Sequence, residues 1–576
     1  MDQKGIRETS IWTLFEKGQE FHRTANIYAD TNRNHEFYNG NQWMGAKLGG
    51  IEPVVKNFIM AIVKYKVAVI HDNLYAIHYS PQCYESSEFQ REAKGYCDLL
   101  NRYAHRIWEL SKMDFLGRRI TKDAAINDEG ILYVDFDKDK KLPINQVIDK
   151  TDIYYGNEND DDIQAQPYIL IRKRLPQVAA IELAKELGIQ TEDISLIVPD
   201  NFNFEQPGYA SRNEVDDMVT VVYKLYRENG TVRFSAATRY CDIVLDQDLG
   251  IKRYPVAHFC WEQKKGSARG EGEVRRLIPN QIEVNRTEMR RVLTAKYQAY
   301  PIRVVDEDKI SNVNAIHQAG GVLKTKGQTV DDVRKVVGVI QPAQMSADVK
   351  MLVDDLINTS RELAGAGDSA TGQINPETAS GRAILAVQQA SQAPMTEQKE
   401  TYKNFIEDVA HIWLEYMIVH SADGIQMEKA DKDPKTGEEI ISLVTVPQSA
   451  LQRLQAQVKI DVTPKSVYDR IAQEQTIENL LVKGFFKPEN MSQLEIYYKV
   501  LPDDAVAPKL MIGEALDYMK SEQKKIAMLQ VKANALQQNM SRQLSELQMA
   551  GMPAGQMSPM QAEMMPATQM GASVAV

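Results

Sequence analysis

Apolar residues recur at the helical period through much of the N-terminal part of the chain. Within 87–129 they fall at Leu99, Tyr103, Ile107 and Leu110, which places them on one face of a helix. The same pattern predicts mainly helical structure over two further ranges, 11–43 and 52–78.

Runs of β-branched and aromatic residues predict strands at 130–137 and 168–174. The clearest hairpin signal is 217–240, where two such runs flank Asn229 and Gly230, the residue pair that suits a type I′ turn. The N-terminal part of the chain is therefore predicted to mix helices and strands.

Two helices of similar length are predicted to enclose a compact insert. The first covers 278–297 with Pro279 in its first turn, and the second covers 347–364, with Ser346 as its N-cap and Gly365 at its C-terminal exit. Such a pair buries few apolar side chains by itself. We therefore expect copies of the chain to pack side by side into a ring or a fibre.

A glycine-rich segment, LAGAGDSATGQ, follows the second helix. Asn375 and Pro376 then start a helix that is predicted to run to about His420. Pro394 should kink this helix, because a proline has no N–H to donate and clashes with the preceding turn.

The C-terminal part of the chain is predicted to be loops and short strands over 421–465 and helical over 470–500. Apolar residues then recur at near-heptad spacing over 524–548. The last 28 residues hold almost no charge, and we expect them to be disordered.

Composition adds three limits. The formal net charge is −11, which argues against a tight non-specific grip on nucleic acid. The four cysteines form no C-x-x-C pair, as expected for a protein of a reducing compartment. The N-terminus has no secretion signal, and the apolar run 58–70 is too short to span a bilayer and is interrupted by Lys64 and Lys66.

The motifs of common enzymes are missing. The chain has no G-x-x-x-x-G-K-[ST], G-x-S-x-G or H-E-x-x-H, so no catalytic residue, metal site or cofactor is predicted. Acidic residues at 135–139 and 157–162 leave a metal-dependent nuclease open as a weaker alternative, although Lys140 stands where a calcium loop needs glycine. A structural protein is the favoured class.

The ordered set of features resembles the portal proteins of short-tailed bacteriophages. It comprises FYNGNQW at 37–43, GEGEVRRLIPNQIEVNR at 270–286, the insert, the return helix, the glycine loop with NPETASGRAI, and the kinked helix. The resemblance covers most of residues 10–500. It implies an α+β subunit with an α/β wing, a two-helix stem, a small α/β clip, a long kinked helix and a helical crown.

Carried onto this chain, the resemblance gives the following parts: the wing over 1–270 and 378–465 (the latter including the kinked helix), stem helices at 271–298 and 346–364, the clip at 299–345, a tunnel loop at 365–377, the crown at 466–523, a possible barrel helix at 524–548 and a tail at 549–576.

The resemblance also implies a function without catalysis. The chain would form a dodecameric ring at one capsid vertex of a virion assembled in the bacterial cytoplasm. Double-stranded DNA would be packaged and ejected through the ring. The other implied partners are the terminase, tail adaptor proteins, the major capsid protein and the scaffold, with no membrane. A different ring-forming head–tail component remains an alternative.

The tunnel loop is the candidate contact with DNA. No lysine or arginine lies between Leu363 and Ser380, so the loop should slide along phosphates rather than hold them. Glycine flexibility would let a ring meet a helical duplex of different symmetry. The DNA-facing candidates are Asp368, Ser369, Thr371, Gln373 and Asn375, and the flexible positions are Gly365, Gly367 and Gly372.

Two groups of basic residues each have alternative roles. Lys324, Lys326, Arg334 and Lys335 of the insert are candidates for a positive ring or for binding acidic partner surfaces, with plain solvated charge equally open. The first stem helix carries a second set, for which we expect ion pairs between subunits with Asp354, Asp355 or Glu362, or contact with DNA: Arg275, Arg276, Arg286, Arg290, Arg291 and Lys296.

Overall fold

A computed structural model gives the fold. It describes residues 8–48, 51–72, 74–81, 87–137, 140–189, 193–200, 217–300, 302–317, 321–326, 336–340, 345–346, 348–367, 393–420, 425–432, 439–446, 448, 458–465 and 509–549. The chain divides into two units, Met1–Lys465 and Ser466–Val576, and each is described by itself.

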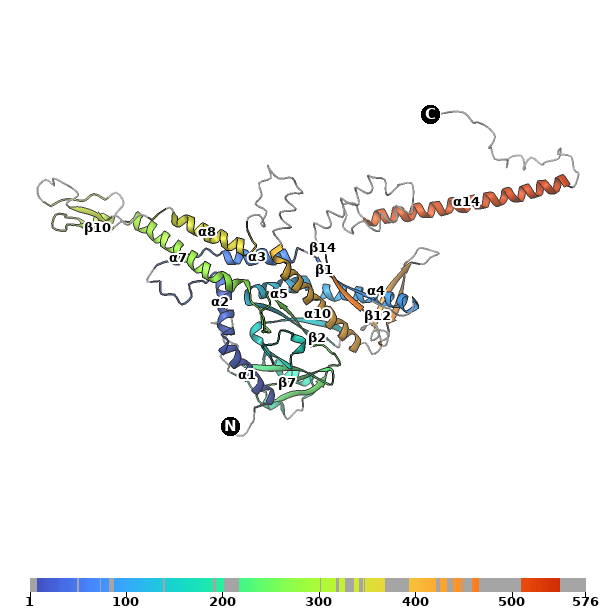
Figure 1. Ribbon diagram of the computed structural model, residues 1–576, viewed down its shortest axis with the longest axis horizontal. Helices are drawn as coiled ribbons and strands as arrows, with labels where there is room; N and C mark the ends of the chain where they lie inside the picture. The colour runs from blue at the N-terminus through green and yellow to red at the C-terminus, as the bar shows by residue number, and fades with distance from the viewer. Residues whose placement is uncertain are drawn as a thin grey trace, which may run out of the picture. The chain divides into compact units, whose positions relative to one another are not determined.

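The first unit alternates helices and antiparallel strands (Figure 1). Its helices are α1 Ser10–Thr24, α2 Ile27–Asn39, α3 Phe58–Ile70, α4 Ser87–Leu110, α5 Met113–Asn127, α6 Gln177–Glu186, α7 Glu273–Ala299, α8 Asp348–Leu363 and α10 Thr396–His420. Short 3₁₀ turns are η1 Lys150–Asp152, η2 Ile163–Ala165, η3 Asp193–Leu196, η4 Val313–His317 and η6 Ala393–Met395.

The strands of this unit are β1 Leu74–Pro81, β2 Glu129–Asp137, β3 Leu142–Ile148, β4 Ile153–Tyr155, β5 Tyr168–Pro176, β6 Met218–Glu228, β7 Thr231–Ala237, β8 Asp242–Asp248, β9 Val256–Cys260, β10 Ile302–Val305, β11 Val337–Ile340, β12 Ile425–Lys432, β13 Glu439–Val446 and β14 Val458–Lys465.

Two antiparallel sheets form the body of this unit. One has the order β4-β5-β6-β7-β8 and the other the order β3-β2-β9. The predicted hairpin is confirmed, because Asn229 and Gly230 join β6 to β7 with φ of 53° and 84°, the left-handed pair that a type I′ turn requires.

The main hydrophobic core lies between the three-stranded sheet and helices α5 and α10. Trp413 and Tyr416 of α10 are buried there, and the Tyr416 hydroxyl donates to the Val134 carbonyl at 3.2 Å. Gly130 of β2 lets α5 lie close to the sheet, since a Cβ at this position would come within 2.5 Å of the Ile120 carbonyl oxygen. Helix α10 therefore completes the hydrophobic core of this unit.

The predicted helix over 52–78 is wrong beyond Ile70. Residues 74–81 form β1, which pairs antiparallel with β14, nearly 400 residues away in the chain. Tyr75 and Tyr79 alternate toward the core, and the Tyr79 hydroxyl donates to the Ala410 carbonyl at 2.9 Å. The alternation of period two is present in the sequence, but the preceding helical run masks it.

Helix α7 begins earlier than predicted, at Glu273, so that Pro279 lies inside the helix. The proline leaves the Arg275 carbonyl without its helical donor, which costs about 3 kcal/mol. We infer that burial of Val274 and Leu277, at about 1.5–3 kcal/mol per side chain, offsets that cost.

Helix α10 begins at Thr396, directly after the 3₁₀ turn that contains Pro394. The residues from Asn375 to Gln392 lie outside the described part of the chain. The helix predicted on the N-terminal side of Pro394, and hence the kink, stay predictions.

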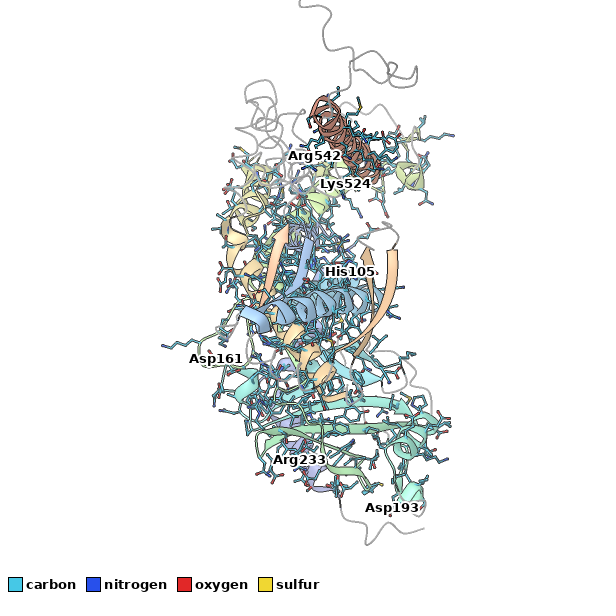
Figure 2. The ribbon with its side chains drawn as sticks, turned by 90° about the vertical axis from the view of Figure 1, so that its right-hand side faces the viewer. His105, Asp161, Asp193, Arg233, Lys524 and Arg542 are labelled. Carbon is cyan, nitrogen blue, oxygen red and sulfur yellow. The ribbon has the colours of Figure 1, made fainter. Side chains whose placement is uncertain are left out.

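In the second unit the structure describes one helix, α14 Lys509–Met549. It is longer than the predicted helix at 524–548. Its apolar stripe is open to solvent at Ile526, Leu529 and Leu536, and the labelled Lys524 and Arg542 lie on the same helix (Figure 2). Within the described residues, no helix of either unit has the length and apolar content needed to cross a membrane.

The GEGE turn before α7 has a steric explanation. A Cβ on Gly270 would lie 2.1 Å from Cys260 Sγ and 2.6 Å from the Glu262 carbonyl oxygen, and one on Gly272 would lie 2.9 Å from the Asp128 nitrogen. Both glycines are needed because the chain passes directly over the end of the three-stranded sheet.

Replacing Gly270 by alanine should therefore lower the free energy of unfolding by about 2 kcal/mol, through overpacking against Cys260. Gly95→Ala is the matched control, because Gly95 lies in α4 with open space around its Cα and should gain up to about 1 kcal/mol from helix propensity. Urea unfolding followed by tryptophan fluorescence compares the two, and equal effects would contradict the close-approach explanation.

Candidate functional site

Helices α7 and α8 form an antiparallel pair that projects from the body of the first unit (Figure 1). The Asn280 side chain donates to Ser360 Oγ at 2.9 Å. The Ser360 hydroxyl in turn donates to the Leu356 carbonyl, one turn earlier in α8, at 2.6 Å. The Asn280–Ser360 hydrogen bond fixes the register of the two helices near the body.

The N-terminal end of α7 is anchored by a buried ion pair. Lys66 of α3 donates to Glu273 Oε2 at 2.7 Å, and the Trp261 indole N–H donates to the same oxygen at 3.3 Å. Both charged side chains are almost fully buried. In the sequence Lys66 stands out only as a charge within an apolar run, and such a charge is a signal of a buried partner.

A second anchor holds the residue before α7. Asp128, which follows α5 with a φ of 80°, accepts the Gly272 N–H at 2.7 Å and is also paired with the buried Lys150. The Asp128 carbonyl accepts the Trp261 N–H at 3.0 Å. One aspartate therefore connects α5, β9 and the start of α7.

Arg269 is the centre of a larger buried network. Its guanidinium donates to Glu129 at 2.6 Å, to Glu158 at 2.9 and 3.0 Å and to His22 Nε2 at 2.9 Å, and it stacks on the Tyr155 ring at 4.9 Å. No sequence motif distinguished this arginine from the exposed basic residues around it.

The network fixes protonation states. Burial acts to raise the pKa of Glu129, but the Arg269 guanidinium and the hydrogen bond from His258 outweigh it and hold that pKa at about 2. Burial, together with the charges of Arg269 and Lys150, holds the pKa of His22 far below its usual value, so His22 is neutral.

Away from these anchors, the helix pair α7–α8 is largely exposed to solvent. The buried residues of α7 end at Thr287, and only Val353 and Ser360 of α8 are buried. Large apolar side chains are exposed on both helices, including Tyr297, which is 52% exposed, and Met351, which is 70% exposed. A monomer therefore leaves unburied surface along most of the pair.

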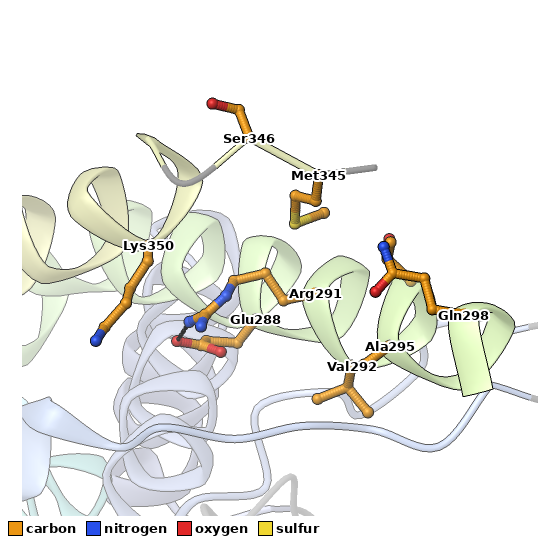
Figure 3. Close-up of a pocket in the computed structure, with 9 residues that line it drawn as sticks. Glu288, Arg291, Val292, Ala295, Gln298, Met345, Ser346 and Lys350 are labelled. Atoms are coloured by element: carbon orange, nitrogen blue, oxygen red, sulfur yellow. Dashed lines mark hydrogen bonds and ion pairs between the residues drawn. The ribbon is translucent and has the colours of Figure 1, made fainter. Parts of the chain in front are cut away.

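A hollow of about 370 Å³ lies between the far end of α7 and the start of α8 (Figure 3). Arg291 and Glu288 are joined across its floor by an ion pair of 2.8 Å, while Met345 and Lys350 reach it from the returning chain. The two helices thus diverge where they meet the insert.

The insert contains a small antiparallel sheet, in which Ile302 pairs with Ile340. Ile302, Val304, Val339 and Ile340 are all more than half exposed. A two-stranded sheet without a covered face is marginal in water, so this sheet is expected to gain stability from a partner. Of the four predicted basic residues, Lys324 and Lys326 have exposed side chains, and Arg334 and Lys335 lie outside the described residues.

Gly365 ends α8 as predicted. Its φ is 69°, its N–H donates to the Glu362 carbonyl at 2.9 Å, and the Ala366 N–H donates to the Arg361 carbonyl at 2.7 Å, which together form a Schellman motif. A Cβ on Gly365 would lie 3.0 Å from Pro394 Cβ. Gly365, predicted as a helix exit, and Pro394, predicted as a helix kink, therefore lie next to each other.

Of the other loop candidates, Gly367 lies within the described residues and the rest lie outside them. Gly367 is described and has an ordinary environment for a side chain, with Glu362 Cγ at 3.5 Å from the position of a Cβ. The following predicted residues lie outside the described part of the chain: Asp368, Ser369, Thr371, Gly372, Gln373 and Asn375.

Most of the basic residues of α7 have partners within the chain. Arg275 pairs with Asp30 at 3.4 Å, Lys296 with Glu52 at 2.7 Å, and Arg276 with Glu262 and Glu271. Asp354, predicted to pair between subunits, lies 3.8 Å from Lys56 of its own chain. These pairs lie within one chain, so the expectation of pairing between subunits stays a prediction for these residues.

The described residues of the acidic segments are not placed as metal ligands. Among the described residues, no group of three or more histidines, cysteines or carboxylates is placed to hold a metal ion. Asp137 pairs with Lys140 at 3.3 Å, and Asp161, labelled in Figure 2, is exposed on its loop. The geometry of these residues gives the nuclease alternative no support.

Replacing Lys66 by methionine should lower the free energy of unfolding by about 3 kcal/mol, because Glu273 would keep its buried charge without a cationic partner and with only the Trp261 N–H as donor. The double variant Lys66→Met/Glu273→Gln should lose less than the single one. Lys64→Met, at an exposed position of the same helix, is the control. Urea unfolding measures all three, and a Lys66→Met variant as stable as the control would refute the anchor.

Stability should also fall as the pH drops from about 7 to 4. Burial lowers the pKa of both His71 and His411 from the ordinary value of 6.5 to about 4 in the folded chain. As the pH falls below 6.5, the unfolded chain therefore binds protons that the folded chain does not bind. Melting temperatures across this range test it. His71→Gln and His411→Gln should each flatten the dependence, and the double variant should flatten it further.

Comparison with known proteins adds one match. The family model described as Phage P22-like portal protein matches residues 241–571, which is more than half of the 576-residue chain. No curated protein matches the chain. The matched range includes α7, the insert and α8.

Proposed function

The chain belongs to the P22-like phage portal protein family, a family of structural, non-enzymatic virion components, and from that premise we propose which of its parts perform each step. Membership implies an oligomeric ring through which DNA passes. We assign α7 and α8 as the stem that lines the channel, and the insert with β10 and β11 as the clip. The remainder of the first unit is the wing.

The observation that carries this assignment is the exposed helix pair. The pair is held firmly at one end by Lys66–Glu273 and Asp128–Gly272, yet its outer half buries almost nothing. Exposed apolar surface along a helix pair is typical of a contact site, and other copies of the chain would cover it. Side-by-side packing around a rotation axis provides that cover.

Helix dimensions agree with a channel for duplex DNA. Twelve helices of about 10 Å diameter placed side by side give a circumference of roughly 120 Å. The centre-line diameter is then about 38 Å, which leaves an opening of roughly 28 Å after one helix diameter is subtracted. A duplex passes through such an opening with space for a loop. We therefore propose a dodecamer at one capsid vertex.

The segment after Gly365 is proposed as the loop that meets the DNA. Its support is that Gly365 and Pro394 hold the two ends of residues 366–393 together at the body end of α8. The polar, uncharged-to-acidic composition of 368–375 suits sliding contact with phosphates, and the chain charge of −11 adds repulsion. DNA would thus be guided without being held.

We further propose that the insert docks the terminase during packaging and tail adaptor proteins afterwards. The exposed apolar side chains of β10 and β11, together with the exposed Lys324 and Lys326, support a surface for an acidic partner with apolar contacts. The outer parts of the first unit would contact the major capsid protein and the scaffold.

Residues 466–523 are proposed as the crown, and the exposed apolar stripe of α14 supports assembly of that helix into a barrel with its copies. A different head–tail ring component is disfavoured, because a match to the portal family covers more than half of the chain.

Purified full-length chain should form closed rings of about twelve copies. End-on negative-stain images and native mass spectrometry measure this directly. A protein that stays a compact monomer at high concentration would contradict the assignment of α7 and α8 as a stem.

Deleting 368–373 should leave rings intact and impair DNA packaging or retention in virions. The deletion begins after Gly367, because the Ala366 N–H completes the Schellman motif of α8 and its side chain is buried. Gly367→Val with Gly372→Val should give a milder form of the same defect through restricted backbone freedom. Loss of rings in the deletion variant would mean that the loop is structural.

Purified chain should not cut DNA in the presence of Mg²⁺ or Mn²⁺. Specific cleavage that Asp137→Ala abolishes would support the nuclease alternative instead.

A further inference from the structure

We propose that the ring closes through a charge-paired contact in which Arg286 and Arg290 of α7 on one copy meet Asp355 of α8 on the next copy. This inference rests on the proposed ring and names the surfaces that build it. Three observations support it: the composition of two exposed helix faces, the register that one hydrogen bond fixes, and the direction in which each face points.

The outer face of α7 lies opposite its buried face. Pro279, Glu283, Arg286, Arg290 and Tyr297 follow one another at intervals of three, four or seven residues, and all are exposed. The two arginine side chains are 55% and 65% exposed, and each lies 3.9 Å from Glu283. Exposed pairs at that distance contribute little, so both arginines are free to pair elsewhere.

The outer face of α8 has the opposite charge. Met351, Asp355 and Glu362 lie on the side of α8 away from the buried Val353 and Ser360. Neither Asp355 nor Glu362 forms an ion pair within the described residues. We therefore define this face by these two acidic residues and the exposed Met351, and Asp355 is the member whose charge complements the arginines of α7.

The register places the opposite charges at one height. Arg286 lies six residues beyond Asn280 and Asp355 lies five residues before Ser360, so they are about 9 and 7.5 Å from the Asn280–Ser360 hydrogen bond in the same direction along the antiparallel pair, with Arg290 one turn farther out. Copies related by rotation about an axis along the pair keep equal heights. Arg286 and Asp355 of neighbouring copies therefore meet without an axial shift.

The directions of the two outer faces favour a contact of α7 with α8 of the next copy over a contact between two copies of α7. Asn280 and Ser360 turn toward each other, and the outer faces of α7 and α8 lie away from that contact, on different flanks of the pair. A contact of α7 with a second α7 would bring arginine against arginine. An α7-to-α8 contact brings opposite charges together and, repeated around an axis, closes a ring.

The test is a charge exchange in the full chain. Arg286→Glu/Arg290→Glu and Asp355→Arg should each raise the protein concentration needed for half-assembly at least roughly tenfold, because like charges would face each other. Combining all three changes should restore assembly to near that of the unchanged chain. Arg23→Glu, on an exposed turn of α1, is the control and should assemble normally. Native mass spectrometry at low salt measures the copy number.

A second measurement guards against variants that fail to fold. Arg286→Cys/Asp355→Cys rings treated with a short bis-maleimide should give a ladder of covalent multimers on a denaturing gel, whereas Arg286→Cys alone should give none. Both variants also carry Cys83→Ser, because Cys83 lies outside the described residues, whereas Cys97, Cys241 and Cys260 are buried and should not react.

The possible outcomes separate the two proposals. Unchanged assembly of the reversed variants, no rescue by the combined variant, or no ladder would overturn this contact while leaving the ring in place. Failure of the unchanged chain to form rings would instead overturn the proposed function.

Discussion

The arrangement of this subunit depends on buried ion pairs at the point where α7 leaves the sheet. Lys66–Glu273 and Lys150–Asp128 each remove two charges from water, and Arg269 adds a third group with two carboxylates. Such pairs add little net stability compared with apolar residues, but breaking one is costly. Their directional hydrogen bonds fix the orientation of α7, which apolar packing alone would define less sharply.

That orientation has mechanical meaning in a portal. If α7 lines the channel as proposed, DNA under pressure would push on its outer half, and that force would be transmitted to its base. The base is held from three sides, by α3 through Lys66, by the end of α5 through Asp128, and by β9 through Trp261. The insert at the far end has no comparable anchoring within the described residues, which suits a surface that exchanges partners.

Sequence analysis located the elements whose signal is local. The Asn229-Gly230 hairpin, the exit of α8 at Gly365 and the order of helix, insert and return helix were readable from turn chemistry and period. The pairing of β1 with β14 and the Arg269 network were not, because both join residues that are more than 100 positions apart and only the fold brings them together. Pro279 was misplaced because helix-start rules cannot weigh the tertiary burial of Glu273 and Val274.

The meeting of Gly365 with Pro394 means that the chain departs from and returns to the body at one place. Closing a longer segment between fixed ends costs only about 0.6 kcal/mol for each doubling of its length. The intervening stretch can therefore lengthen, shorten or change composition between related phages without disturbing the scaffold beneath. If this segment is the proposed tunnel loop, its contact with DNA can change in evolution without a change in the helices and sheets that build the ring.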